Sequence, residues 1–109
     1  MNLLEQQLEP SGEFPVHEYV QEECDARGWT EEGFIARFQM HGPFPAGQAQ
    51  FIAEFWLYAS SIKGLLMDDD SAETLGKVFG TSAELWKRLH QSHQQWLETH
   101  PTHKENDDG

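Results

Sequence analysis

The chain has 109 residues, a length that suits one domain, and 38% of them are hydrophobic, with four tryptophans and seven phenylalanines among them. That is enough to build one core without a metal or a disulfide. The single cysteine, Cys24, cannot pair within the chain. This excludes the class of disulfide-built secreted domains and makes a reducing cytoplasm the expected location.

The formal net charge is -12 at pH 7, and the charge is unevenly spread. Residues 1–32 hold nine acids and one arginine, whereas residues 33–67 hold two bases and one acid. So acidic a chain repels phosphate backbones at long range and attracts basic partners. A high net charge also serves solubility alone, so both interpretations remain open.

Neither a signal peptide nor a membrane span is expected. Residues 1–10 are polar and acidic and contain no apolar run. The longest apolar stretch, residues 51–67, is interrupted by Glu54 and Lys63 and is too short to cross a bilayer. We therefore expect a soluble protein without membrane contact.

The two ends of the chain differ in composition from the middle. Residues 1–15 contain Pro10, Gly12 and Pro15, and we expect a flexible segment there. Residues 100–109 are polar and charged, and we expect a disordered acidic tail. The predicted domain spans residues 16–99.

The first two predicted helices are marked by spacing and by caps. In residues 16–26, apolar side chains recur every three or four positions, and Gly28 follows as a stop. The second helix begins after Thr30, a good N-cap, and has Glu31 and Glu32 in its first turn, where the helix dipole favours acids.

A loop is expected next, because residues 39–48 contain two prolines and two glycines. The third helix is predicted over residues 48–62, with an apolar stripe at a spacing of three or four and a stop at Gly64.

The last two helices have the clearest boundaries. Asp68 is the expected N-cap of the fourth helix, and Gly80 ends it. Thr81 and Glu84 form a capping box at the start of the fifth, which Pro101 terminates. Since no alternating run suggests a strand, the sequence predicts an all-α domain of five helices.

The sequence does not favour catalysis or metal binding. His90 and His93 share a helix face, but a zinc site needs three or four ligands, and the only cysteine lies far from them in the sequence. Cys24 lies on an apolar helix face, where a cysteine is more often a core residue than a nucleophile. There is also no Gly-rich phosphate loop and no nucleophile elbow. We expect no enzyme, no metal and no cofactor.

Two blocks of sequence are similar to a known family. The first comprises residues 14–30 and the run Ile35-Ala36-Arg37-Phe38, and the second comprises residues 67–86 with the run FGTSAELW, followed by Leu89 and Trp96. Together they resemble the HigA-type antitoxins, a branch of the lambda-repressor-like (Xre) helix-turn-helix proteins. The resemblance implies a helix-turn-helix made by the second and third helices, a homodimer, a small basic ribonuclease toxin as partner, and repression of the chain's own promoter.

Under this hypothesis the DNA contacts fall on the second and third helices and just beyond them. The candidate side chains, all able to touch phosphates or bases, are Arg37, Gln48, Gln50, Tyr58, Ser60, Ser61 and Lys63.

The chain departs from the family pattern at the centre. Residues 39–50 lengthen the turn that sets the angle of the recognition helix, and the base-reading positions fall on residues 54–57, one acid and three apolar side chains. Core packing is the favoured interpretation of Phe55 and Trp56, and an exposed protein-binding patch is the alternative. A second hypothesis is therefore a repurposed domain that has lost DNA binding and inhibits a partner protein, either a toxin or a nucleic-acid-binding protein.

The last helix carries the candidate dimer interface, which consists of Trp86, Leu89 and Trp96. The two tryptophans are ten residues apart and lie on nearly the same side of a helix. They form either a homodimer contact or the cap of the monomer core.

Overall fold

A computed structural model describes residues 12–99. This part of the chain folds into five helices and contains no strand: α2 (Val16–Arg27), α3 (Glu31–His41), α4 (Ala46–Tyr58), α5 (Asp69–Phe79) and α6 (Ala83–Thr99). The prediction of an all-α, five-helix fold is confirmed. The expectations for residues 1–11 and 100–109 lie outside the described residues.

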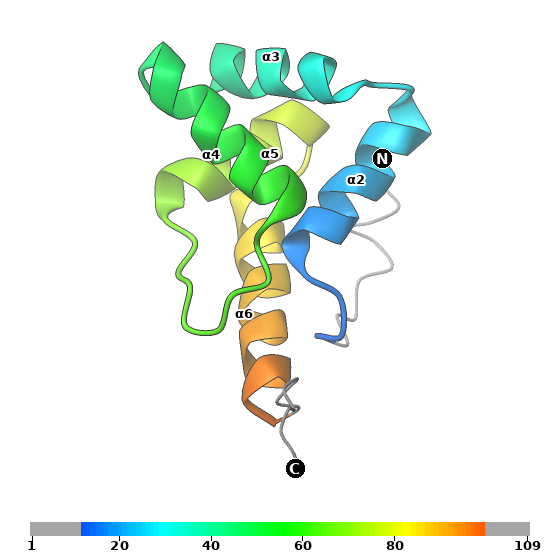
Figure 1. Ribbon diagram of the computed structural model, residues 1–109, viewed down its shortest axis with the longest axis vertical. Helices are drawn as coiled ribbons and strands as arrows, with labels where there is room; N and C mark the ends of the chain where they lie inside the picture. Colours follow the sequence, from blue (N-terminus) through cyan, green and yellow to red (C-terminus); the bar gives the residue numbers. More distant parts are fainter. Residues whose placement is uncertain (1–11, 100–109) are drawn as a thin grey trace.

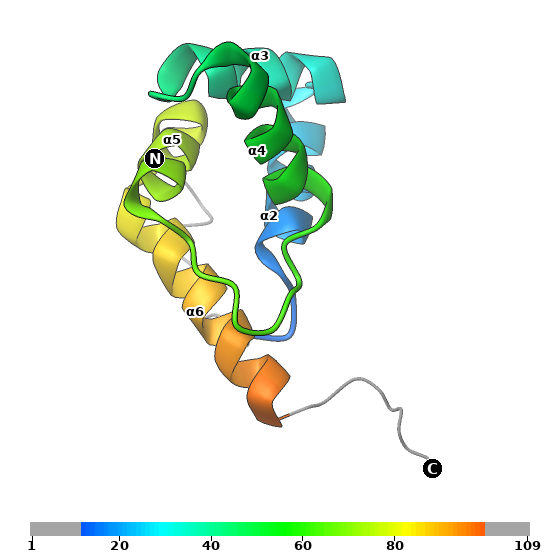
Figure 2. The ribbon, with the colours of Figure 1, turned by 60° about the vertical axis from the view of Figure 1, so that its left-hand side comes forward.

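The helices surround one core (Figures 1 and 2). α3 lies across one end of the molecule and packs on α4 and α5, while α2 packs on α4 and α6. α6 is the longest helix and lies against α5. The connection between α4 and α5, residues 59–68, descends beside α6 and returns, as both views show.

Aromatic rings join the helices at the centre of the core. The ring of Phe79 lies 5.8 Å from that of Phe34 and 5.5 Å from that of Trp86, so α3, α5 and α6 meet around one side chain. All three residues are buried. Such ring pairs add stability beyond the apolar area they bury.

Several predicted helix ends are confirmed. The hydroxyl of Thr30 accepts a hydrogen bond from the Gly33 amide at 3.1 Å. Asp68 is the N-cap residue of α5, as expected. Gly28 and Gly80 follow α2 and α5 with φ of 71° and 74°, the left-handed conformation that glycine adopts without a steric penalty.

The predicted capping box of the last helix is wrong. α6 begins at Ala83, and the Ser82 hydroxyl accepts from the Leu85 amide at 3.2 Å. The hydroxyl of Thr81 instead accepts from the Trp86 indole N–H at 2.7 Å. Thr81 is thus the hydrogen-bond acceptor of a buried tryptophan and does not cap α6.

The predicted long loop between the second and third helices is also wrong. α3 continues to His41 and α4 begins at Ala46, so only residues 42–45 connect them. A Cβ atom on Gly42 would lie 2.9 Å from both Phe44 Cδ2 and Thr74 Oγ1, so the turn requires glycine. The Phe44 ring stacks on Phe38 at 5.7 Å and fixes the turn against the core.

The start of the chain is packed from Gly12 onward, although flexibility was expected up to residue 15. Gly12 and Pro15 are buried. A Cβ atom on Gly12 would lie 2.5 Å from the Ser92 carbonyl oxygen, so this residue lies directly on α6.

Candidate functional site

The 59–68 segment is held against α6 by hydrogen bonds from polar side chains. The Gln94 amide group donates to the Ile62 carbonyl at 2.8 Å and accepts from the Gly64 amide at 2.6 Å. His90 Nε2 lies 2.8 Å from the Leu65 carbonyl oxygen, and because a carbonyl only accepts, Nε2 carries the proton. These bonds replace the helix predicted for residues 59–62, since α4 ends at Tyr58.

Two further histidines hold the same segment. The Ser60 hydroxyl accepts from the His17 amide at 2.9 Å, and the Ser60 amide donates to His17 Nδ1 at 3.1 Å. The Ser61 hydroxyl lies 2.9 Å from His93 Nε2, while His93 Nδ1 donates to the Gly12 carbonyl at 2.7 Å. We call His17, His90 and His93 the histidine pins.

Burial affects the protonation of two of these pins. It lowers the pKa of His17 and of His90 below the usual value. Nδ1 of His90 is buried without a hydrogen-bond partner among the described residues, so protonation there would create an unpaired charge. Within residues 12–99, no group of three His, Cys, Asp or Glu residues could hold a metal ion.

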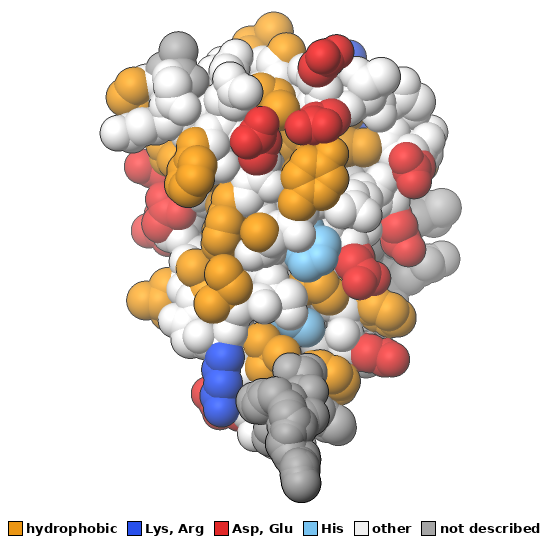
Figure 3. All heavy atoms as spheres, viewed as in Figure 1, with side chains coloured by type: hydrophobic (Ala, Val, Ile, Leu, Met, Phe, Trp, Pro, Cys, Tyr) orange, Lys and Arg blue, Asp and Glu red, His pale blue; other side chains and the backbone are white. Residues whose placement is uncertain are grey.

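An exposed apolar surface lies beside the 59–68 segment. Phe51 on α4 is 70% exposed, and Leu66 is 86% exposed. With the half-buried Ile52, Phe55 and Leu65 they form what we call the apolar face. Figure 3 shows hydrophobic side chains gathered between α4 and the segment that follows it.

Acidic side chains border the apolar face. Asp68 lines the hollow that Phe51 and Leu66 also line, and Glu54 lies one helical turn from Phe51. Lys87 forms an ion pair with Asp69. Over the whole described chain, fourteen Asp and Glu residues outnumber six Lys and Arg residues, so this border belongs to an acidic surface.

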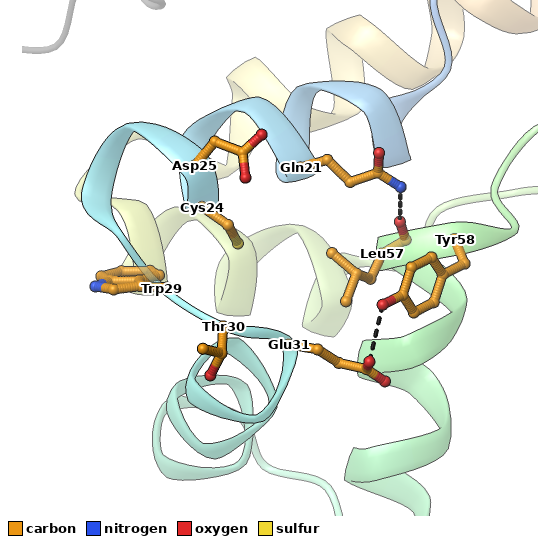
Figure 4. Close-up of a pocket in the computed structure, with 8 residues that line it drawn as sticks. All are labelled: Gln21, Cys24, Asp25, Trp29, Thr30, Glu31, Leu57 and Tyr58. Carbon is orange, nitrogen blue, oxygen red and sulfur yellow. Dashed lines mark hydrogen bonds between the residues drawn. The ribbon is translucent and has the colours of Figure 1, made fainter.

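A second hollow, of about 170 Å³, lies between α2, the start of α3 and the end of α4 (Figure 4). The Tyr58 hydroxyl donates to Glu31 at 2.9 Å across its rim, and Gln21 donates to the Leu57 carbonyl at 2.7 Å. Burial raises the pKa of the Cys24 thiol to about 11, so the thiolate nucleophile is scarce at neutral pH. The two hydrogen bonds join α4 to α3 and to α2, and the hollow contains no activated nucleophile.

Three of the predicted DNA contacts are engaged within the protein. Ser60 is 0% exposed. The Arg37 guanidinium lies 4.0 Å from the centre of the Trp29 ring and donates to the Gly33 carbonyl at 3.0 Å. The Tyr58 hydroxyl is bound to the Glu31 carboxylate, whose charge repels phosphate.

The other four predicted contacts do not form one patch. Gln48 and Gln50 are exposed in the first turns of α4, whereas Ser61 and Lys63 are exposed on the 59–68 segment. The first pair lies near the start of α4 and the second pair follows its last residue, Tyr58, so most of the length of the helix separates the two pairs along the chain.

The supposed base-reading positions are largely inside the protein. Trp56 and Leu57 are buried in the core, and Phe55 is half-buried. Core packing is therefore the correct interpretation of Trp56. Phe55 lies at the edge of the core and contributes to the apolar face.

The predicted dimer contacts are corrected in part. Trp86 and Leu89 are buried within one chain, so their side chains have no surface left for a second copy. Trp96 is half-buried, and its ring stacks on His93 at 5.9 Å. Of the three, only Trp96 can still contact a partner.

Within residues 12–99, no helix combines the length and the apolar character that a bilayer span requires.

The comparisons with known proteins give no assignment. No protein-family model matches the chain, and no curated protein or solved structure is significantly similar to it.

Proposed function

We propose that this chain is an acidic protein-binding module that holds a basic partner protein. The observation that supports this most directly is the apolar face, where Phe51 and Leu66 are exposed beside acidic side chains. Contiguous exposed apolar surface costs solubility and marks interaction sites in soluble proteins. An acidic border selects a partner of opposite charge.

The distribution of basic side chains favours a protein partner over DNA. Nucleic-acid affinity depends on Lys and Arg contacts to phosphates. Arg27 pairs with Glu23, Lys87 pairs with Asp69, and Arg37 covers Trp29. Among residues 12–99 the remaining Lys and Arg side chains are Lys63, Lys77 and Arg88, too few for a basic surface on so acidic a chain.

A toxin–antitoxin pair is the setting that we propose for this binding. The sequence resemblance to HigA-type antitoxins implies a small basic toxin, and the acidic border of the apolar face suits such a partner. Of the two functions that the resemblance implies, the proposal retains toxin binding and does not include DNA recognition.

A DNA-retention experiment tests the choice between protein and DNA. The purified chain is mixed with sheared fragments of its host genome at salt concentrations between about 50 and 200 mM, the range over which phosphate contacts weaken steeply. We expect no fragment to be enriched, and no difference between the wild type and the Lys63→Ala variant. A single fragment retained by the wild type at the higher salt concentration would overturn the proposal, and its loss in Lys63→Ala would assign a phosphate contact to that residue.

A further inference from the structure

The apolar face contains two adjoining hollows that share the walls Leu65 and Leu66. One, of about 250 Å³, is lined on the α4 side by Phe51, Ile52 and Phe55. The other, of about 370 Å³, lies toward α6 and is lined by residues that include Met67, Lys87, His90 and Gln94. Leu66 belongs to the common wall of the two hollows, and its side chain is almost fully exposed.

The hollows have firm walls. On the α6 side, His90 and Gln94 are the same side chains that hydrogen-bond to the 59–68 segment. On the α4 side, Trp56 is buried and packs edge-on against His90 with ring centres 5.4 Å apart. Preformed walls lower the entropic cost of binding, because few side chains must be ordered on contact.

The charged side chains around the hollows indicate the sign of the occupant's charge. Asp68 lines the first hollow and Asp69 the second, with Asp70 next to them at the start of α5. Among residues 12–99, Lys87 is the only Lys or Arg that lines either hollow, and it is paired with Asp69. Asp68 and Asp70 therefore leave a negative border.

We propose that the two hollows receive one amphipathic helix of a basic partner, with apolar side chains in both hollows and Lys or Arg side chains beside Asp68 and Asp70. This inference rests on the proposed function and names the part of the partner that binds. A helix suits the site because its apolar side chains recur at i, i+3, i+4 and i+7, so two of them reach hollows on either side of Leu66. The described residues also offer no strand edge that an extended peptide could join.

The test uses the full chain and a synthetic peptide stapled into a helix. The peptide carries leucines at i, i+3, i+4 and i+7 and lysines on both flanks. One control peptide has glutamates in place of the lysines, and a second has the same composition with the leucines dispersed around the helix. Binding is measured by fluorescence anisotropy, and the contact surface is mapped by amide chemical-shift changes.

We expect the lysine-flanked peptide to bind the wild type and to shift the amides of α4, residues 64–68 and α6. Phe51→Asp and Leu66→Asp should each weaken this binding by about tenfold or more, because a charge would enter the centre of the contact. Met40→Asp is the matched control, since Met40 is 74% exposed and lines neither hollow. Circular dichroism verifies that each variant remains folded.

Three results would overturn the inference: no binding of the lysine-flanked peptide, equal binding of the glutamate-flanked or dispersed peptide, or equal loss of binding in Met40→Asp. If no peptide binds and the chain self-associates in a way that Leu66→Asp abolishes, the occupant of the apolar face is a second copy of this chain. The proposed function has a separate failure: it falls if the chain retains a specific DNA fragment, whereas a partner complex that survives Leu66→Asp refutes only the helix site.

Discussion

Trp86 shows how one side chain connects several parts of this small core. Its ring lies 5.5 Å from that of Phe79, and its indole N–H donates to the Thr81 hydroxyl at 2.7 Å. A buried tryptophan usually has such a partner, because an unpaired N–H in the core costs free energy. The residue thus joins α6 to the end of α5 and is part of the core of one chain rather than of a dimer interface.

Replacing Trp86 should therefore be far more harmful than replacing Trp96. Trp86→Ala is expected to lower the free energy of unfolding by about 3–5 kcal/mol, because it leaves a cavity in the core. Trp96→Ala, at a half-buried position, should cost about 1 kcal/mol. Urea denaturation followed by circular dichroism measures both.

If Trp86→Ala proves too unstable to purify, Trp86→Phe keeps one aromatic ring in the core and loses the bond to Thr81 and part of the ring volume, so it should destabilise the protein less than Trp86→Ala. If substitutions at Trp86 and at Trp96 lower the free energy of unfolding equally, α6 is not packed as described.

At the scale of elements, the 59–68 segment depends on neutral histidines. His17 Nδ1 accepts from the Ser60 amide and cannot do so once it is protonated. His90 Nε2 donates to the Leu65 carbonyl, and its Nδ1 has no acceptor among the described residues. Protonation therefore disfavours the fastened arrangement of this segment.

The pH dependence of stability follows from these pins. Burial lowers the pKa of His17 and of His90. Glu18 opposes the change in pKa at His17, the bond to the Leu65 carbonyl opposes it at His90, and His93 adds to it at both. Their contribution is complete above the unfolded pKa of about 6.5 and is lost as the pH falls through the lower folded pKa. His17→Gln and His90→Gln should each reduce the loss of unfolding free energy between pH 7 and pH 5, measured by urea denaturation.

His41→Gln is the control for this prediction, because His41 is exposed at the end of α3. Protonation of the many carboxylates also changes stability over this range, so the informative quantity is the difference between each variant and the wild type. A pH dependence unchanged by both substitutions would contradict the role given to the pins.

The elements that sequence predicts well are those with local signals. Thr30 caps α3 with its hydroxyl, and Gly28 and Gly80 end helices in the left-handed conformation. Asp68 occupies the expected N-cap position of α5 but makes no side-chain cap hydrogen bond. The errors arise where distant contacts decide. Residues 59–62 have helical spacing, but bonds from His17 and α6 hold them in a non-helical path.

The candidate site was only partly predictable for the same reason. An exposed aromatic patch was one alternative for Phe55, yet Phe51 is the aromatic side chain that α4 exposes most. Leu66 gave no periodic signal because it lies in the non-helical segment between α4 and α5. Its exposure becomes visible only once the segment is seen folded back along α6.

For the whole molecule, acidity and exposed apolar surface support the same function. A chain with net charge -12 disfavours nucleic acid and attracts basic proteins. The apolar face adds apolar surface that a partner can bury, which attraction between charges does not provide by itself. A basic protein that binds there gains from both.

Binding of a basic partner through the apolar face is best tested by native mass spectrometry of the chain isolated from its own host at near-physiological salt, with wild type and Leu66→Asp prepared side by side. We expect the wild type to carry a small basic protein in a fixed ratio and the variant to have lost it. If both forms are free of protein partners, or if the wild type is isolated with DNA in place of a protein, the proposed binding of a basic partner is wrong.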